Sequence, residues 1–251
     1  MKKLNSILEF LGGTAQLTAE IGRQLVTRPF YFRLFLEQLY QVGIRSFPLV
    51  FIVAASVGMV MALQFGVGLE KFGGKLYVPK IVSLSIVREL GPVFACLMVA
   101  ARIGAGFTSE IGSMTVTQQI DAIRALGTSP IKRIVIPRVL ACLVGVPILC
   151  IFADTIGVLG GLLVGQSELG LDPQFYYQKI VTTVTITDYM SGLLKTPFFA
   201  LFIAIPACYF GLTSSGGTSG VGQSTTRSVV TSCILILIGD YFLTKLFLVF
   251  E

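Results

Sequence analysis

The chain contains no histidine and no tryptophan among its 251 residues, and only 13% of its residues are charged. Without histidine there are no histidine metal ligands, no Ser-His nucleophile pairs and no histidine proton relays. The five cysteines lie within apolar runs and form no CxxC pair, so neither a disulfide framework nor a metal site is favoured. These absences argue against a membrane-embedded enzyme.

Apolar residues dominate what is present. Hydrophobic residues make up 54% of the chain, and its mean hydropathy is +0.83. This composition is typical of integral membrane proteins and not of soluble domains. The net charge of +6 does not indicate a nucleic-acid partner, because the basic residues flank the apolar runs and do not gather in one patch. We interpret them as signals of membrane topology and as contacts to lipid headgroups.

The apolar runs predict an all-α integral membrane protein with five transmembrane helices. A helix needs about 20 apolar residues to span a bilayer, and the expected spans are residues 47–68, 90–107, 139–165, 192–212 and 228–250. Residues 1–45 are too charged to span, and residues 46–251 form the membrane domain. Leu4, Ile7, Leu8 and Leu11 have the spacing of an amphipathic helix, which predicts an N-terminal helix in the membrane interface.

Three patterns predict details of the backbone. Pro92 removes a helical donor, so we expect a kink or a restart at the beginning of the second crossing. Gly157, Gly161 and Gly165 recur at every fourth position, which predicts a closely packed helix pair. Residues 213–226 are rich in Gly, Ser and Thr and are expected to form a loop.

Residues 108–138 form the one extended polar stretch, and a partial apolar periodicity predicts a short helix within it. Lys and Arg are concentrated here and in residues 1–45, so we expect a cytoplasmic N-terminus and an external C-terminus. Lys71, Lys75 and Lys80 in the first external loop run against this orientation. An N-terminus without a transit peptide favours a bacterial membrane over that of a plastid.

Five charges fall inside or beside the apolar runs: Arg88, Glu89, Arg102, Asp154 and Asp240. An unpaired charge in hydrocarbon costs at least about 2.5 kcal/mol, so each must reach water, a partner or the interface. Arg102, near the cytoplasmic end of its span, can snorkel to lipid phosphate. Arg88 and Glu89 are adjacent and cannot face each other on a helix. One of them is expected to point into a water-accessible cavity, and placement at the outer interface is the alternative.

Several sequence blocks together resemble the MlaE/YrbE family of ABC-transporter permeases, the membrane subunits of bacterial MCE-type lipid transport systems. The blocks are "RELGP" (88–92), "ARIGAGFTSEIGSM" (101–114), "QQIDAIRALGTSPI" (118–131), "PR" (137–138), "DTIGVLGG" (154–161) and "TTRSVV" (225–230). They occur in the family's order, and the resemblance covers about residues 40–250.

The resemblance implies a homodimer around a lipid cavity and a cytoplasmic coupling helix between the second and third spans. The implied substrate-binding residues are Met61, Gln64, Arg88, Glu89, Leu90 and Arg227. The implied ATPase-coupling residues are Glu110, Met114, Gln118, Gln119, Asp121 and Arg124. Many family members have Glu-Gln where this chain has Gln118-Gln119, so an ion pair through that Glu is not assumed here.

The resemblance also implies partners: an MlaF-like ABC ATPase, a periplasmic MlaD-like MCE protein, a STAS-domain MlaB-like protein, and phospholipid as cargo in a bacterial inner membrane. The sequence has no G-x-x-x-x-G-K-[ST] motif, so we expect the partner ATPase to bind ATP and Mg²⁺, and this chain to hold no cofactor.

The competing interpretation is an ion- or proton-coupled secondary transporter using Glu89, Asp154 and Asp240. Against it, the chain shows no internal repeat, and five spans do not divide into two halves.

Overall fold

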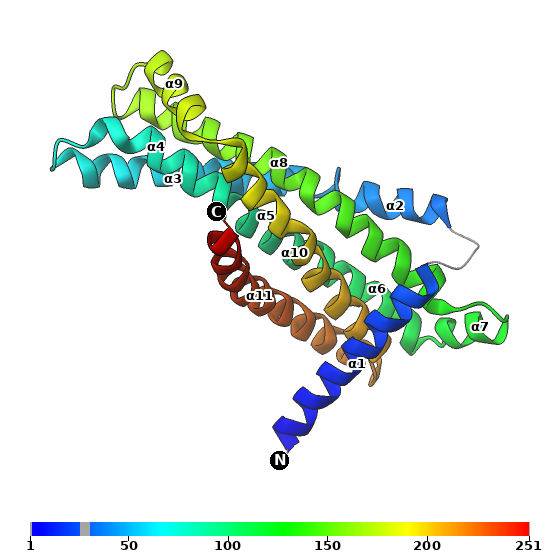
Figure 1. Ribbon diagram of the computed structural model, residues 1–251. Coiled ribbons are helices and arrows are strands. Elements are labelled where there is room, and N and C mark those ends of the chain that lie inside the picture. Colours follow the sequence, from blue (N-terminus) through cyan, green and yellow to red (C-terminus); the bar gives the residue numbers. More distant parts are fainter. Residues whose placement is uncertain (1, 26–30, 251) are drawn as a thin grey trace. The chain divides into compact units, whose positions relative to one another are not determined.

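The computed structural model describes residues 2–25 and 31–250, with side chains from residue 8 to residue 25 and from residue 31 to residue 249. Within these residues all regular elements are helices (Figure 1), as the sequence predicts. Five helical stretches are long and apolar enough to cross a membrane. Of the predicted interfacial pattern, Leu4 and Ile7 lie outside the described side chains, whereas Leu8 and Leu11 are exposed.

The five candidate spans are Phe32–Glu70, Lys75–Val116, Ile131–Ser167, Ile186–Leu212 and Gly217–Val249. The elements in chain order are α1 (Lys2–Leu25), α2 (Phe32–Val42), α3 (Phe47–Glu70), η1 (Lys75–Tyr77), α4 (Val78–Ser85), η2 (Ile86–Leu90), α5 (Gly91–Val99), η3 (Ala100–Gly104), α6 (Ala105–Val116), α7 (Gln119–Ala125), η4 (Ile131–Val135), α8 (Ile136–Ser167), α9 (Pro173–Thr183), α10 (Ile186–Leu212) and α11 (Gly217–Phe250). The element η1 is a short 3₁₀ turn, and η2, η3 and η4 are π-turns.

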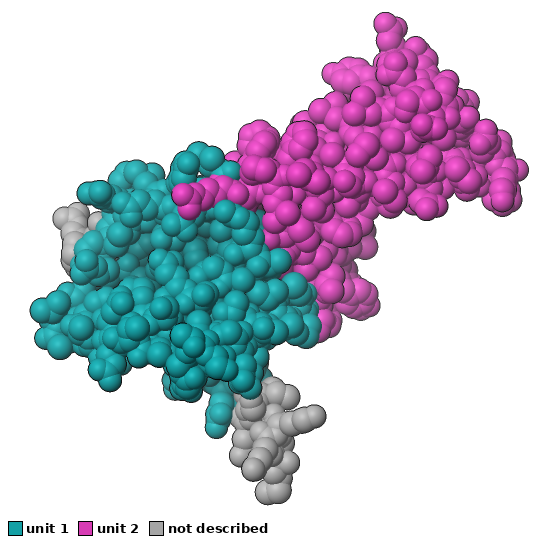
Figure 2. Space-filling model, turned by 180° about the vertical axis from the view of Figure 1, so that it is seen from behind, with its two compact units in different colours: residues 1–44, 99–145, 200–235 teal, residues 45–98, 146–199, 236–251 magenta. Residues whose placement is uncertain are grey.

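The chain divides into two compact units, which Figure 2 shows in separate colours. Unit 1 comprises residues 1–44, 99–145 and 200–235, and unit 2 comprises residues 45–98, 146–199 and 236–251. In unit 1, the Thr108 hydroxyl donates to the Ala207 carbonyl at 3.1 Å, which joins α6 to α10. Arg102 donates to the Gln41 carbonyl at 3.2 Å, close to the C-terminal end of α2, where a positive charge is favourable.

In unit 2, α4 packs against α3 and α9 (Figure 1). Gly58 of α3 lies directly against the backbone of Gly157 in α8, so close that a methyl group on Gly58 would overlap it. Gly165 instead lies against the ring of Tyr176 in α9, a buried residue whose pKa burial raises to about 12. Gly157 therefore makes the close helix contact that was predicted, whereas Gly165 makes room for the Tyr176 side chain of α9.

The last helix begins earlier than the sequence predicts. The chain turns at Gly216 and Gly217, which have positive φ angles of 86° and 69°, and α11 then continues to Phe250. The prediction of a loop through residue 226 is therefore wrong. Its serine and threonine hydroxyls bond to the helix itself, as Thr225 does to the Val221 carbonyl at 2.8 Å, so they do not divert the backbone into a loop.

Pro92 does not interrupt the second membrane helix, which is described as continuous from Lys75 to Val116. A π-turn, η2, stands where a kink or restart was expected, and the Gly91 N–H donates to the Ile86 carbonyl. A π-turn uses bonds five residues apart and holds one residue more than an α-turn, so it changes which way the following side chains point. The helix begins well before residue 90, the predicted start of the span.

Candidate functional site

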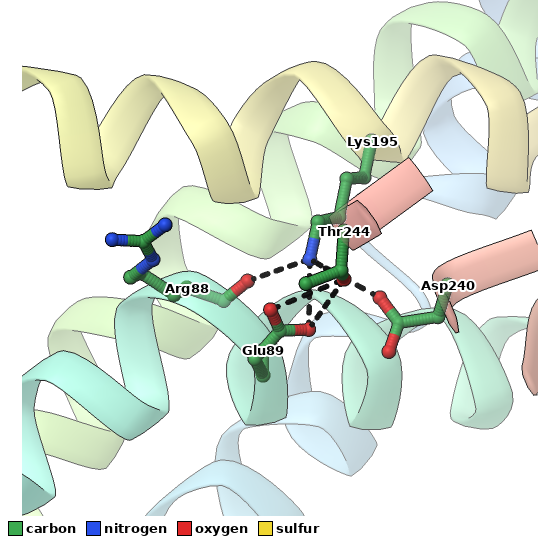
Figure 3. Close-up of polar contacts among 5 residues, drawn as sticks. All are labelled: Arg88, Glu89, Lys195, Asp240 and Thr244. Atoms are coloured by element: carbon green, nitrogen blue, oxygen red, sulfur yellow. Dashed lines mark hydrogen bonds and ion pairs between the residues drawn. The ribbon is translucent and has the colours of Figure 1, made fainter. Parts of the chain in front are cut away.

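Lys195 of α10 is fully buried in unit 2, and its ammonium group has four polar contacts (Figure 3). Its Nζ atom lies 2.7 Å from Glu89 Oε2, 3.3 Å from Asp240 Oδ1, 2.7 Å from Thr244 Oγ1 and 3.1 Å from the Arg88 carbonyl oxygen. The Thr244 hydroxyl lies 3.2 Å from both Glu89 carboxylate oxygens. We call these five residues the Lys195 cluster.

The proline explains part of this geometry. In an α-helix the Arg88 carbonyl would accept from the N–H of residue 92, but proline has none. A buried carbonyl without a donor is unfavourable by roughly 1–3 kcal/mol. The Lys195 ammonium takes the place of the missing N–H, so the sequence "RELGP" creates the acceptor that Lys195 occupies.

The Arg88 side chain has a different partner from its neighbour Glu89. Its guanidinium donates to Asp188 Oδ1 at 2.9 Å. The other Asp188 oxygen accepts from the Thr185 N–H at 3.0 Å and from the Thr185 hydroxyl at 2.6 Å. The Thr185 hydroxyl also accepts from the Asp188 N–H, so the two residues form a reciprocal cap at the start of α10. Arg88 is thereby fixed to a rigid helix end.

Apart from the Arg88 guanidinium, which pairs with Asp188, the Lys195 cluster contains one cation and two carboxylates. The Lys195 side chain is 0% exposed, whereas the Glu89 and Asp240 side chains are 34% and 20% exposed. The positive charge therefore lies in the interior, and the excess of negative charge is on the accessible side. Such an arrangement can accept a proton or a positively charged group, or it can exchange hydrogen bonds when the helices move.

The other predicted substrate-binding residues do not join this cluster. Met61 packs against the apolar cluster formed by α3, α4 and α9, and Gln64 is exposed on α3. Leu90 lines a narrow apolar cavity of about 10 Å³ together with residues of α3 and α8. Of the predicted set in unit 2, the structure therefore brings only Arg88 and Glu89 together around one polar centre.

Arg227 belongs to unit 1 and lies on α11 at the edge of a cavity of about 660 Å³. The lining is mixed: Glu9, Gln223 and Thr226 are polar, whereas Phe10 is aromatic. A second cavity of about 660 Å³ runs along α1 and α10, and almost all its lining is apolar. Phe10 lines both cavities and stacks on Phe210 at 5.4 Å between ring centroids.

The predicted coupling residues follow one another on α6, the turn after it and α7. Gln118 connects the two helices with a left-handed φ angle of 59°, which non-glycine residues rarely adopt. Glu110 pairs with the buried Arg138 at 2.7 Å, and Asp121 pairs with Arg124 at 3.2 Å on the surface. The coupling residues that are exposed are Glu110, Gln118, Gln119, Asp121 and Arg124, whereas Met114 is half-buried.

Sequence reasoning missed Lys195, Asp188 and Thr244. Lys195 could have been found, because it is a charged residue inside the predicted fourth span. Glu89 and Asp240, which lie beside or within other apolar runs, each needed a positively charged partner. Asp188 gave no comparable signal, because it precedes the apolar segment and resembles an ordinary loop residue. Among the described residues, no group of three or more Cys, Asp or Glu could hold a metal ion.

Five apolar helices and a buried charged cluster define a multi-pass membrane protein. The chain belongs to the MlaE permease family, whose sequence profile, described as Permease MlaE, matches residues 35–246. A probable ABC transporter permease protein of Rickettsia bellii is 42% identical over 223 residues, 89% of this chain and 86% of that protein. One from Synechocystis is 39% identical over 211 residues, 84% of this chain and 80% of that protein.

A plant protein, TRIGALACTOSYLDIACYLGLYCEROL 1, chloroplastic, from Arabidopsis thaliana, is 29% identical over 231 residues, 92% of this chain and 66% of that protein. The chain is therefore a permease subunit of an ABC transporter and not itself an enzyme. ABC permeases work with an ATPase partner, so the energy source is ATP hydrolysis in another chain. This membership argues against the competing interpretation, an ion- or proton-coupled secondary transporter.

Proposed function

We propose that this chain moves phospholipid between a bacterial inner membrane and a periplasmic MCE carrier of the MlaD type. Two copies would form the permease, an MlaF-like ATPase would drive it, and an MlaB-like STAS protein would be a further subunit. The family membership supports this assignment. The plant relative also supports it, because its name is that of a glycolipid, trigalactosyldiacylglycerol. ATP and Mg²⁺ would be bound by the ATPase.

The observation that carries the proposal is the pair of cavities that share Phe10. One is partly polar and has Arg227 at its edge, and the other is almost wholly apolar. An amphiphile has the same division, with a charged headgroup and apolar chains. Among the described residues Arg227 has no carboxylate partner, so its guanidinium can bind a phosphate without breaking an ion pair.

Arg88 is a weaker candidate for the phosphate contact than Arg227. Its guanidinium is held by Asp188 at 2.9 Å, so a lipid phosphate would have to compete with a carboxylate. Glu89, in contrast, is partly exposed and holds Lys195 and Thr244. We propose that Glu89 and Asp240 border the lipid pathway and exchange hydrogen bonds during the transport cycle. Met61 and Leu90 would contribute apolar surroundings, and Gln64 a polar group beside them.

The surface for the ATPase would be α7 with the turn before it. Gln118, Gln119, Asp121 and Arg124 are exposed there, and Leu126 is 80% exposed just beyond the helix. An exposed apolar side chain beside charged groups fits a docking surface for another protein. The proposed orientation places this helix and the N-terminus in the cytoplasm, and the C-terminus in the periplasm. The Lys75–Glu70 ion pair at 3.2 Å offsets part of the positive charge that opposed this orientation.

The test is ATP-driven transfer of fluorescent phospholipid from proteoliposomes that contain the permease and its ATPase. We expect transfer from the wild type, and a several-fold loss in Arg227→Gln with ATP hydrolysis retained. Arg33→Gln is the matched control, because Arg33 is 93% exposed and pairs with Glu37 on its own helix. Equal transfer by the two variants would remove Arg227 from the lipid site. Absence of ATP-driven transfer in the wild type would contradict the function itself.

A further inference from the structure

Asp154 of α8 is a buried carboxyl group in unit 2 that the proposed function does not use. It is 1% exposed, and its Oδ1 atom has no hydrogen-bond partner among the described residues. Its Oδ2 atom accepts from the Cys150 thiol of the same helix at 3.7 Å. No basic side chain in the described part of the chain forms an ion pair with Asp154.

An ionised carboxylate in this position would be very unfavourable. A buried charge is tolerated only when an opposite charge or several hydrogen bonds compensate it. Cys96 and Tyr189 are titratable side chains close enough to interact with this pair, Cys96 with Cys150 and Tyr189 with both members, and neither supplies a positive charge. Asp154 should therefore carry a proton, and a protonated carboxyl group is itself a donor that needs an acceptor.

A candidate acceptor is in the π-turn η2. Asp154 Oδ1 and the Ile86 carbonyl oxygen both lie within 3.0 Å of the point that a Cβ atom on Gly91 would occupy. The glycine thus leaves room for the carboxyl group beside the turn. The Ile86 carbonyl already accepts from the Gly91 N–H, and its second lone pair can accept one more hydrogen bond.

We propose that Asp154 is a neutral carboxylic acid whose O–H donates to the Ile86 carbonyl, and that this bond holds the π-turn in place. An α-turn advances about 100° per residue, so removing the extra residue of the π-turn would rotate neighbouring side chains by about that angle. Arg88 and Glu89 lie within the turn and would lose their alignment with Asp188 and Lys195. Asp154 is thus a positioning residue for the Lys195 cluster.

The effect on transport rests on the proposed lipid-transport function, but the protonation state can be measured without it. Infrared difference spectra of the purified complex with ¹³C-labelled aspartate, wild type minus Asp154→Asn, should show the C=O stretch of a protonated carboxyl group. Asp172→Asn is the control, because Asp172 is an exposed N-cap at the start of α9 and should give ionised carboxylate bands. Carboxylate bands from Asp154 would overturn the proposal whether or not the complex transports lipid.

Two substitutions separate hydrogen bonding from charge. Asparagine keeps a donor for the Ile86 carbonyl, so Asp154→Asn should retain lipid transfer within about twofold of the wild type. Asp154→Leu has no donor, so the bond proposed to hold the π-turn is lost, and lipid transfer should fall about tenfold or more. Equal loss in both variants would overturn the positioning role, because it would show that the amide does not replace the acid.

A third variant guards against simple misfolding of Asp154→Leu. A methyl group in Gly91→Ala would overlap Asp154 Oδ1, so this variant should lose lipid transfer although the acid is intact. Adding Asp154→Ala removes the overlap, and the double variant should transfer better and unfold at a higher temperature than Gly91→Ala alone. If the losses of lipid transfer and of thermal stability caused by the two substitutions are additive, the Asp154 carboxyl group does not contact the π-turn. That result would contradict the proposal.

Discussion

Among the described residues, each unit buries one basic side chain beside a partly exposed glutamate, but the two units compensate the charge differently. In unit 2, Lys195 is 0% exposed and contacts two carboxylates, a hydroxyl and a carbonyl. In unit 1, the Arg138 side chain is 7% exposed and pairs with the Glu110 carboxylate at 2.7 Å. Arg138 also donates to the Ile134 carbonyl of its own helical turn at 2.8 Å and lies over the Phe107 ring.

The difference lies in what each cation connects. The partners of Lys195 come from η2 and α11, so its contacts hold three separate helical segments together. Arg138 joins α8 to α6 through one ion pair that faces water on the side of Glu110, which is half exposed. We infer that unit 2 depends on its buried charge for stability, whereas unit 1 leaves the acidic member of its pair, Glu110, accessible to a partner protein.

The largest effect is expected for Lys195→Met. It leaves Glu89 and Asp240 without their counter-charge, and breaking a buried ion pair typically costs about 3–5 kcal/mol. Thermal unfolding of the purified complex in detergent measures this loss. Lys245→Met is the control on α11, because Lys245 is exposed. Equal unfolding temperatures for the two variants would contradict the structural role of the cluster.

The next effect concerns the backbone contact within unit 2. Gly58→Ala would place a methyl group in the Gly157 backbone, and overpacking typically costs about 1–3 kcal/mol. Gly68→Ala on the same helix has no atom within 4 Å of the added methyl group and serves as the control. The same unfolding assay should separate the two variants. If Gly58→Ala is as stable as Gly68→Ala, α3 and α8 are not in close contact.

A smaller effect is expected in unit 1 for Glu110→Gln. The amide still accepts a hydrogen bond from Arg138, and Glu110 is half exposed, so the loss should be about 1 kcal/mol. This value should fall clearly below that for Lys195→Met in the same assay. A loss of equal size would show that both units depend on buried charge to the same extent.

The smallest effect on stability is expected for Asp121→Asn. The Asp121–Arg124 pair is on the surface, so its loss should change the free energy of unfolding by less than about 0.5 kcal/mol. If α7 docks on the ATPase, less ATPase should co-purify with the Asp121→Asn permease than with the wild type, although the stability of the permease is almost unchanged. Unchanged recovery of the ATPase would count against a docking role for this pair.

Hydropathy was sufficient to predict the five helices, because bilayer thickness fixes their length and polar residues interrupt them. It failed at the start of α11, where composition favoured a loop and the hydroxyls bond to their own helix instead. The sequence also places Arg88 and Glu89 side by side without telling which partner each finds. That choice depends on the π-turn, which lengthens one turn by a residue and has no reliable sequence pattern.

Only part of the candidate site could be predicted from the sequence. Two acids without a counter-charge, Glu89 and Asp240, should have pointed to Lys195 as the cation in a neighbouring span. Asp188 could not be found in this way, because its role depends on the cap that it forms with Thr185 at the start of α10. Asp154 was recognised as an intramembrane charge, but its position beside Gly91 emerges only from the packing of α8 on η2.

We propose that the Lys195 cluster serves lipid movement and that ATP hydrolysis is coupled through unit 1. The most direct measurement is the amount of phospholipid transferred per ATP hydrolysed by the reconstituted complex carrying Glu89→Gln. The amide preserves the shape of Glu89 but removes a charge from the cluster. ATP hydrolysis should continue in this variant, while the lipid transferred per ATP should fall several-fold. A ratio equal to that of the wild type would contradict this proposal.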